Sequence, residues 1–134
     1  MNAVIVEDDF GSRRLLQAIL KDLAAVDVVI DGEEAIEAFQ MAWRDNQPYN
    51  IIFLDIMMPR MDGQTALKKI REEERAMGID HKDEVPVIMT TALDDPKNVI
   101  EAFNKGGATG YIVKPIDRQT LFNQLSNFGI SFNS

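Results

Sequence analysis

The five residues Ile51-Ile52-Phe53-Leu54-Asp55 indicate the architecture of the whole chain, because four apolar residues lead directly into a carboxylate. A short apolar run without alternating polar residues is typical of a strand covered on both faces, as in a parallel sheet. The position of Asp55 at the end of such a strand partly removes its carboxylate from water. Because this costs free energy, a carboxylate at such a position indicates a function. Asp55 is therefore the first candidate for a functional residue.

Four further apolar runs of similar length lie on either side of this stretch, at residues 3–6, 26–30, 87–89 and 111–113. Between the runs, apolar residues recur at helical spacing, and Asp31, Asp95 and Asp117 stand where helix N-caps are expected. Five strands alternating with five helices predict an α/β fold, in which a parallel sheet carries helices on both faces. The stretch 72–84 is charged and polar, and the sequence does not indicate which part of the fold it contacts.

The composition excludes several classes of protein. With 14 basic and 22 acidic residues the chain carries a net charge of −8, which argues against binding to nucleic acid or to an anionic membrane. It has no Cys, so disulfides, thiolate metal sites and a Cys nucleophile are excluded. The first residues lack a basic signal region, and no apolar run approaches about 18 residues. We therefore expect a cytoplasmic chain without a membrane span, and its 134 residues predict one domain with no effector domain.

Right-handed crossovers between parallel strands bring the carboxyl ends of all strands to one edge of the sheet, where ligands bind in such folds. The polar residues that follow strands are Glu7, Asp8, Asp9, Asp55, Thr90, Thr91 and Lys114. Clustered carboxylates repel one another, and Mg²⁺ relieves this repulsion while it keeps several waters. An ammonium group and a hydroxyl suit phosphate oxygens. This set predicts phosphoryl chemistry, with Asp55 as the nucleophile.

Four segments of the chain together resemble the receiver domain of two-component response regulators, of the stand-alone chemotaxis-regulator type. They are Val4-Ile5-Val6-Glu7-Asp8-Asp9, Leu54-Asp55-Ile56-Met57-Met58-Pro59-Arg60-Met61-Asp62-Gly63, Met89-Thr90-Thr91-Ala92 and Gly110-Tyr111-Ile112-Val113-Lys114-Pro115. The resemblance covers about residues 2 to 128 and implies a flavodoxin-like, doubly wound sheet with the strand order 2-1-3-4-5. Residues 1–128 would form the receiver domain and residues 129–134 a C-terminal tail.

The resemblance implies a role for each acid at the strand ends. Asp55 would be the phosphoacceptor, loaded from a phosphohistidine. Asp8 and Asp55 would hold Mg²⁺, or Mn²⁺ in its place, directly, Glu7 would act mostly through water, and Met57 would contribute its backbone carbonyl. The side chains of Met57 and Leu93 cannot orient an attacking water by hydrogen bonding, so they would shade the phosphate and tune its loss.

Other residues would respond to the phosphoryl group. Lys114 would pair with the phosphoacceptor or its phosphate, and Thr91 and Ala92 would bind the phosphoryl group. Tyr111 would swing between an exposed and a buried position. The peptide bond before Pro115 is expected to be cis, a state that is rare even for proline and needs tertiary support.

The function that follows from the resemblance is a switch, with slow self-dephosphorylation as its only catalysis. Phosphorylation adds about −1.5 to −2 charges, and the surface over residues 97–111 would change shape to bind a target protein in trans. A sensor histidine kinase or a histidine phosphotransfer protein would act upstream in phosphorelay signal transduction. The chain would be a monomer, or a dimer that forms on phosphorylation.

Two other functions remain open. A phosphatase of the haloacid-dehalogenase type also uses Asp, Thr, Lys and Mg²⁺ around a parallel sheet. Its nucleophile follows the first strand, with a second Asp two residues later, whereas Glu7 stands at that place here and Met57 stands two residues after Asp55. A receiver-like interaction module that is never phosphorylated typically lacks the acceptor, the acids or the lysine, and this sequence has all of them.

Overall fold

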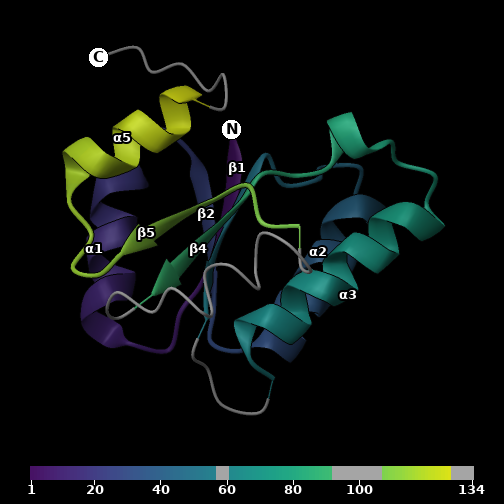
Figure 1. The fold of residues 1–134 in the computed structure, drawn as a ribbon, viewed down its shortest axis with the longest axis horizontal. Helices are drawn as coiled ribbons and strands as arrows, with labels where there is room; N and C mark the ends of the chain where they lie inside the picture. The colour runs from purple at the N-terminus through teal and green to yellow at the C-terminus, as the bar shows by residue number, and fades with distance from the viewer. Residues whose placement is uncertain (57–60, 92–106, 128–134) are drawn as a thin grey trace.

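The computed structural model describes residues 1–56, 61–91 and 107–127 of the chain (Figure 1). Its elements, in chain order, are β1 (Asn2–Val6), α1 (Phe10–Leu20), β2 (Ala25–Val29), α2 (Gly32–Arg44), β3 (Ile51–Asp55), α3 (Gly63–Ala76), the 3₁₀ helix η1 (His81–Asp83), β4 (Val87–Thr91), β5 (Gly110–Val113) and α5 (Arg118–Asn127). The helix expected to start at Asp95 and the tail 129–134 lie outside the described residues.

The five strands form one parallel sheet with the order β2-β1-β3-β4-β5, which confirms the expected topology. β3 is the central strand and is buried along its whole length, as its continuous apolar sequence predicts. In the register between β3 and β4, Asp55 lies opposite Thr90. The parallel arrangement places the carboxyl ends of all five strands at the same edge of the sheet.

Helices cover both faces of the sheet, with α1 and α5 on one side and α2 and α3 on the other (Figure 1). Successive side chains of a strand point to opposite faces, so the three inner strands β1, β3 and β4 each supply both cores. The core beneath α2 and α3 contains Val4, Val6, Ala35, Phe39, Ile52, Leu54, Ala66, Leu67, Ile70, Val87 and Met89. The core beneath α1 and α5 contains Ala3, Ile5, Leu16, Ile19, Leu20, Ile51, Phe53, Ile88, Ile112, Leu121 and Leu125.

Each α-helix in the described residues begins after an aspartate whose carboxylate accepts a hydrogen bond from the backbone N–H three residues later. These aspartates are Asp9, Asp31, Asp62 and Asp117, with distances of 2.9, 2.9, 2.8 and 2.8 Å. Such a cap satisfies one of the backbone donors left free at a helix start. The caps expected at Asp31 and Asp117 are confirmed.

The second strand is displaced by one residue from its predicted bounds of 26–30. It runs from Ala25 to Val29 and ends before Ile30. The backbone N–H of Ile30 donates to Glu34 Oε1 at 3.1 Å, so this group bonds to a helix side chain instead of continuing the ladder. The prediction included Ile30 because its side chain is apolar. In the structure this side chain is 46% exposed and lies beyond the end of the strand.

The charged stretch 72–84 is fastened to the sheet by a buried ion pair. Arg71 Nη1 lies 2.7 Å from Glu74 Oε1, and both residues are almost completely buried. Glu74 Oε2 accepts from the backbone N–H of Val85 at 2.7 Å, and Arg71 Nη2 donates to the carbonyl of Gly107 at 2.9 Å. The pair therefore ties α3 to the starts of β4 and β5. Within the described part of the chain, every helix is too short or too polar to cross a bilayer.

Candidate functional site

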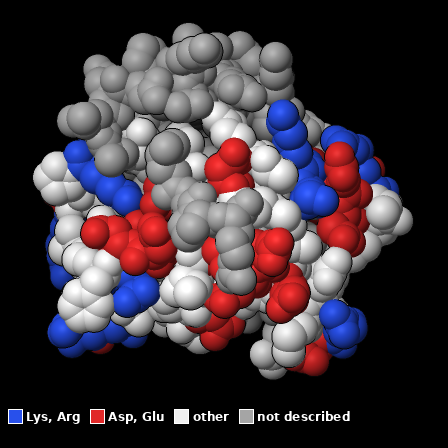
Figure 2. Space-filling model, turned by 90° about the horizontal axis from the view of Figure 1, so that it is seen from below, with Lys and Arg blue, Asp and Glu red and all other residues white. Residues whose placement is uncertain are grey.

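Three carboxylates meet at the edge where the strands end. Glu7 and Asp8 directly follow β1, and Asp55 is the last residue of β3. One oxygen from each of the three lies within 4.8 Å of the others. Figure 2 shows this side of the molecule, where Asp and Glu side chains gather near the centre and Lys and Arg side chains lie nearer the rim. The sequence prediction that the three acids converge is therefore confirmed as geometry.

Lys114 brings a positive charge between two of these acids. Its Nζ lies 2.9 Å from both carboxylate oxygens of Glu7 and 3.4 Å from Asp55 Oδ2. Its backbone N–H donates to the carbonyl of Thr91 at 2.7 Å, which fixes the residue directly after β5. The peptide bond to Pro115 is cis, as expected. The ammonium group therefore reaches the acids at the ends of β1 and β3 from β5, the strand at one side of the sheet.

Glu7 is the most deeply placed acid, with only 1% of its surface exposed. Its Oε1 accepts hydrogen bonds from Lys114 Nζ and from the backbone N–H of Asp9, at 2.9 and 3.1 Å, whereas Oε2 accepts none. Burial raises the pKa of Glu7 from 4.5 to about 7; the hydrogen bond from Lys114 acts against this rise, and the charge of Asp55 adds to it.

The same contacts affect Lys114. Burial acts to lower the pKa of Lys114, but the hydrogen bond to Glu7 and the charges of Asp55 and Glu7 outweigh burial, so the pKa is raised. Lys114 is therefore held in its charged form. Among the described residues, one ammonium group faces three acids at this edge, and it lies 2.9 Å from the Glu7 Oε2 that accepts no hydrogen bond. Oxygen donors with this excess of negative charge fit a hard divalent cation.

The backbone of Gly63 packs closely against the backbone of Asp55. A Cβ atom added to Gly63 would collide with the backbone carbonyl of Asp55 and would lie 2.9 Å from the Cα of Ile56. The N–H of Gly63 donates to the carbonyl of Ile56 at 3.0 Å, and the N–H of Ile56 donates to Thr90 at 3.0 Å. Since only a residue without a side chain permits this approach, Gly63 positions the backbone that carries Asp55. The sequence alone did not single out Gly63; a signal that could have found it is Asp62, an acid directly before a stretch with apolar residues at helical spacing.

The predicted switch residues lie on the two neighbouring strands. Thr91 ends β4, is 4% exposed and pairs with Val113 in the register of β5. Tyr111, on β5, is 39% exposed, and its carbonyl accepts from Gln124 Nε2 at 3.3 Å. The other predicted contributors, Met57, Ala92 and Leu93, lie outside the described residues.

Asp9 has a local structural role that its place in an acidic run did not reveal. Its Oδ2 accepts from the backbone N–H of Ser12 at 2.9 Å, and this hydrogen bond lowers the pKa of Asp9. Asp9 therefore starts α1 and lies outside the group of acids that the structure brings together. The signal for this cap was an aspartate placed directly before a stretch with apolar residues at helical spacing.

Comparison with known proteins identifies the class to which this fold and site belong. The family model of the response regulator receiver domain matches residues 3–126. The Chemotaxis protein CheY homolog of Campylobacter jejuni is 31% identical over 127 residues, which make up 95% of this chain and 91% of that protein. The chain belongs to the response regulator receiver domain family.

Two solved structures place the chain among CheY-like receiver domains. A chain of the CheX-CheY-BeF3-Mg+2 complex from Borrelia burgdorferi matches with a TM-score of 0.78 and 32% identity, over 96% of this chain and 89% of that chain. A chain of the co-crystal of the Saccharomyces cerevisiae histidine phosphotransfer protein Ypd1 and the receiver domain of Ssk1 matches with a TM-score of 0.82 and 25% identity, over 96% and 88%.

Many relatives are longer than this chain. The chain spans 44% of the probable transcriptional regulator ycf27 of Cyanophora paradoxa, which is 33% identical over 119 residues. It spans 10% of the osmosensing histidine protein kinase SLN1 of Saccharomyces cerevisiae. Receiver domains therefore occur in proteins of different overall organisation, and the comparisons define the domain itself.

Proposed function

We propose that this receiver domain accepts a phosphoryl group on Asp55 from the phosphohistidine of a sensor histidine kinase or a histidine phosphotransfer protein. The observation that carries the proposal is the convergence of Glu7, Asp8 and Asp55, with one oxygen of each within 4.8 Å, beside an ammonium group 3.4 Å from Asp55. Positioning and charge neutralisation are what phosphoryl transfer requires of a protein.

The acidic cluster would hold Mg²⁺, or Mn²⁺ in its place. Asp8 and Asp55 are its expected direct ligands, together with the backbone carbonyl of Met57, and Glu7 is expected to act through water. A divalent cation at this place supplies positive charge to the oxygens of the transferred group. The three carboxylates beside one ammonium group support the proposal, because a divalent cation would balance the negative charge that Lys114 alone does not neutralise.

The nucleophile of the covalent step is the side chain of Asp55. A carboxylate oxygen attacks the phosphorus atom, a phosphorus–oxygen bond forms, and the phosphorus–nitrogen bond to the donor histidine breaks. The electron pair of that bond returns to the imidazole, which takes up a proton. Lys114 then neutralises part of the charge on the acyl phosphate, which it can reach because its Nζ already lies beside Asp55.

The new charge is expected to bias a two-state element. In this proposal the Thr91 hydroxyl moves to bond the phosphoryl group, and Tyr111 turns inward from its exposed position. The surface over residues 97–111 then binds a target protein. To act as a switch, the phosphoryl group has to favour one of the two states by a few kcal/mol.

We further propose that the domain works as a stand-alone regulator whose output is a separate protein bound in trans. The Campylobacter chemotaxis relative supports this organisation, because the chain covers 91% of it. The Borrelia and yeast structures support the kind of partner, since one contains CheX and the other a histidine phosphotransfer protein.

Intact-mass measurement after incubation with acetyl phosphate and Mg²⁺ separates the three functions that the sequence leaves open. The receiver function predicts an adduct of one phosphoryl group that is absent in Asp55→Asn and in the presence of a chelator. Turnover of phosphate esters without an adduct at Asp55 would favour the phosphatase. Neither adduct nor turnover would favour an interaction module.

A further inference from the structure

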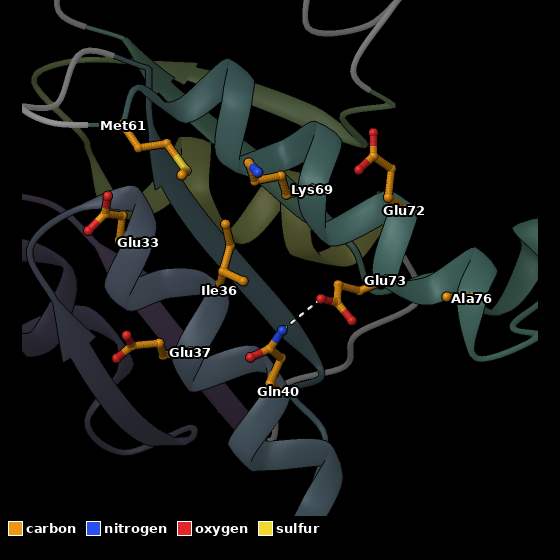
Figure 3. A pocket seen from close by; sticks show the side chains of 9 residues that line it. All are labelled: Glu33, Ile36, Glu37, Gln40, Met61, Lys69, Glu72, Glu73 and Ala76. Atoms are coloured by element: carbon orange, nitrogen blue, oxygen red, sulfur yellow. Dashed lines mark hydrogen bonds between the residues drawn. The ribbon is translucent and has the colours of Figure 1, made fainter.

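A groove lies between α2 and α3. These two helices cover the side of the sheet away from α1 and α5 (Figure 1), and Figure 3 shows the side chains that line the groove. Its main hollow has a volume of about 590 Å³. The described residues that line it are Glu33, Ile36, Glu37, Gln40, Met61, Lys69, Glu72, Glu73 and Ala76. We refer to this hollow and its continuation toward Trp43 as the α2–α3 groove.

The α2–α3 groove has an apolar middle and an acidic rim. Ile36 lies between the two helices, with Glu33 and Glu37 on α2 to one side of it (Figure 3). Glu72 and Glu73 come from α3 on the opposite side. Among the described residues that line the main hollow, four are acidic and Lys69 is the single basic one. The groove therefore presents negative charge around apolar surface.

A hydrogen bond across the groove holds its two walls together. Gln40 Nε2, on α2, donates to Glu73 Oε1, on α3, at 2.6 Å (Figure 3). Phe39 and Ile70, one from each helix, are buried in the common core below. The spacing of the two helices is therefore fixed by packing and by this bond, which gives a preformed groove that needs little ordering when it binds a partner.

The groove continues past Gln40 and Glu73 into a second hollow of about 430 Å³, which Trp43, Arg44 and Met77 also line. Trp43 is 38% exposed and Met77 is 43% exposed. Large apolar side chains left in water beside a concave surface are typical of sites for protein partners, and Trp and Met are enriched in such interfaces. The apolar surface of the groove thus extends along much of α2.

We propose that the α2–α3 groove binds an amphipathic helix of a partner protein, one with an apolar stripe flanked by Lys and Arg. Helices that insert an apolar face into a groove are a common mode of recognition. The 13 residues of α2 are about 20 Å long, which is enough to accommodate about four turns of such a helix. Charge complementarity with the four rim glutamates selects basic flanks over acidic ones.

The proposal goes beyond the phosphoacceptor function and does not depend on it. The residues that line the groove are different from Glu7, Asp8, Asp55 and Lys114. Binding can therefore be measured on the unphosphorylated chain, so a failure of the groove proposal and a failure of phosphorylation at Asp55 are distinct results. In a signalling protein, such a groove would hold a partner independently of the switch surface.

A synthetic helical peptide tests the groove. The probe is about 18 residues or five turns long, has a leucine stripe with lysines on both flanks, and lacks Trp. Trp43 is the single Trp of the chain, so its fluorescence reports on the end of the groove directly. We expect saturable binding by fluorescence anisotropy of the labelled peptide, together with a shift of the Trp43 emission to shorter wavelength.

Two double variants with equal charge distinguish groove binding from general attraction. Glu37→Lys with Glu72→Lys reverses charge on both rims, whereas Asp22→Lys with Asp80→Lys makes the same change at exposed positions elsewhere. The rim variant should weaken binding about tenfold or more, because attractive pairs become repulsive. The matched control should change it by less than about twofold in physiological salt.

Several results would overturn the proposal. They are an equal loss in both variants, no binding by the wild-type chain, and binding that leaves the Trp43 emission unchanged. Circular dichroism of both variants checks that they fold, and the Trp43 emission of the wild-type chain decides the question even where the rim variant does not fold.

Discussion

A single ammonium group, Nζ of Lys114, lies 2.9 Å from the carboxylate of Glu7 although the two residues are 107 positions apart in the sequence. The same atom is 3.4 Å from Asp55. Lys114 thus joins the strand ends of β1, β3 and β5 across the site. It contacts the acid cluster and is positioned to follow any change of charge at Asp55.

We expect Lys114→Ala to uncouple phosphorylation from its structural consequence. Metal affinity should change little, within about threefold, because the carboxylate ligands remain. The response of the β5 amide signals to acetyl phosphate, measured by NMR, should be largely lost, because no ammonium then follows the phosphoryl charge. Lys21→Ala, a change at an exposed lysine in the turn after α1, serves as the matched control. An unchanged response in Lys114→Ala would rule out this role.

Gly63→Ala should displace the backbone of Asp55. The added methyl group has no free space beside the Asp55 carbonyl, so we expect a loss of about 1–3 kcal/mol in the free energy of unfolding, as for other overpacked sites. Phosphorylation by acetyl phosphate should also become slower. Gly11→Ala is the control, because its Cβ would meet only Asp9 Oδ2 at an ordinary 3.7 Å. If both variants unfold at the same denaturant concentration, the close approach has no energetic consequence.

Arg71→Met should be strongly destabilising, by about 3–5 kcal/mol, because it leaves the buried carboxylate of Glu74 without its cation. The double variant Arg71→Met/Glu74→Leu should recover part of this loss, since the unpaired charge is gone. Recovery should be incomplete, because the carbonyl of Gly107 and the N–H of Val85 lose their partners. Urea denaturation of Arg71→Met, Glu74→Leu and the double variant gives the coupling energy between the two side chains. Strictly additive losses in the free energy of unfolding would contradict this account.

The sheet and its functional edge could be predicted from local patterns. Continuous apolar runs such as 51–54 are short-range signals, and the rule of right-handed crossovers converts them into a shared edge. That is why Asp55 and Lys114 could be assigned to one site without any knowledge of distances. The caps at Asp31 and Asp117 were readable as well, because a cap depends on residues only three positions apart, whereas those at Asp9 and Asp62 were not recognised.

The contacts that depend on side chains from distant elements could not be predicted. Lys114 lies closer to Glu7 than to Asp55, because the geometry of the whole sheet edge decides which acid the ammonium reaches. Arg71 and Glu74 stand in a run of charged residues to which the sequence assigned no contact, and the packing of α3 buries both. The sequence shows which residues of such a helix are charged, but it does not show which of these side chains are buried.

The cap of α5 predicts a pH dependence of stability. A hydrogen bond from the backbone N–H of Thr120 lowers the pKa of Asp117. A lowered pKa in the folded state means that the charged carboxylate adds stability above its unfolded pKa of about 3.9, and that this gain is lost as the pH falls through the folded value.

Asp117→Asn keeps the shape of the cap and removes its charge. The variant should therefore melt at a lower temperature than the wild type at pH 7, and the difference should shrink as the pH falls below about 4. Asp22→Asn, in the turn after α1, controls for the loss of an exposed charge. A difference in Tm that stays constant between pH 7 and pH 3 would argue against a contribution from the charge.

The most direct test of the central claim identifies the residue that carries the phosphoryl group. Acyl phosphates, unlike phosphate esters of Ser or Thr, are reduced by borohydride, which converts the aspartate to homoserine. After incubation with acetyl phosphate and Mg²⁺, peptide mapping by mass spectrometry should find homoserine at position 55 and should find none when Mg²⁺ is withheld. Homoserine at another aspartate, or a stable phosphate ester with position 55 unchanged, would contradict the account.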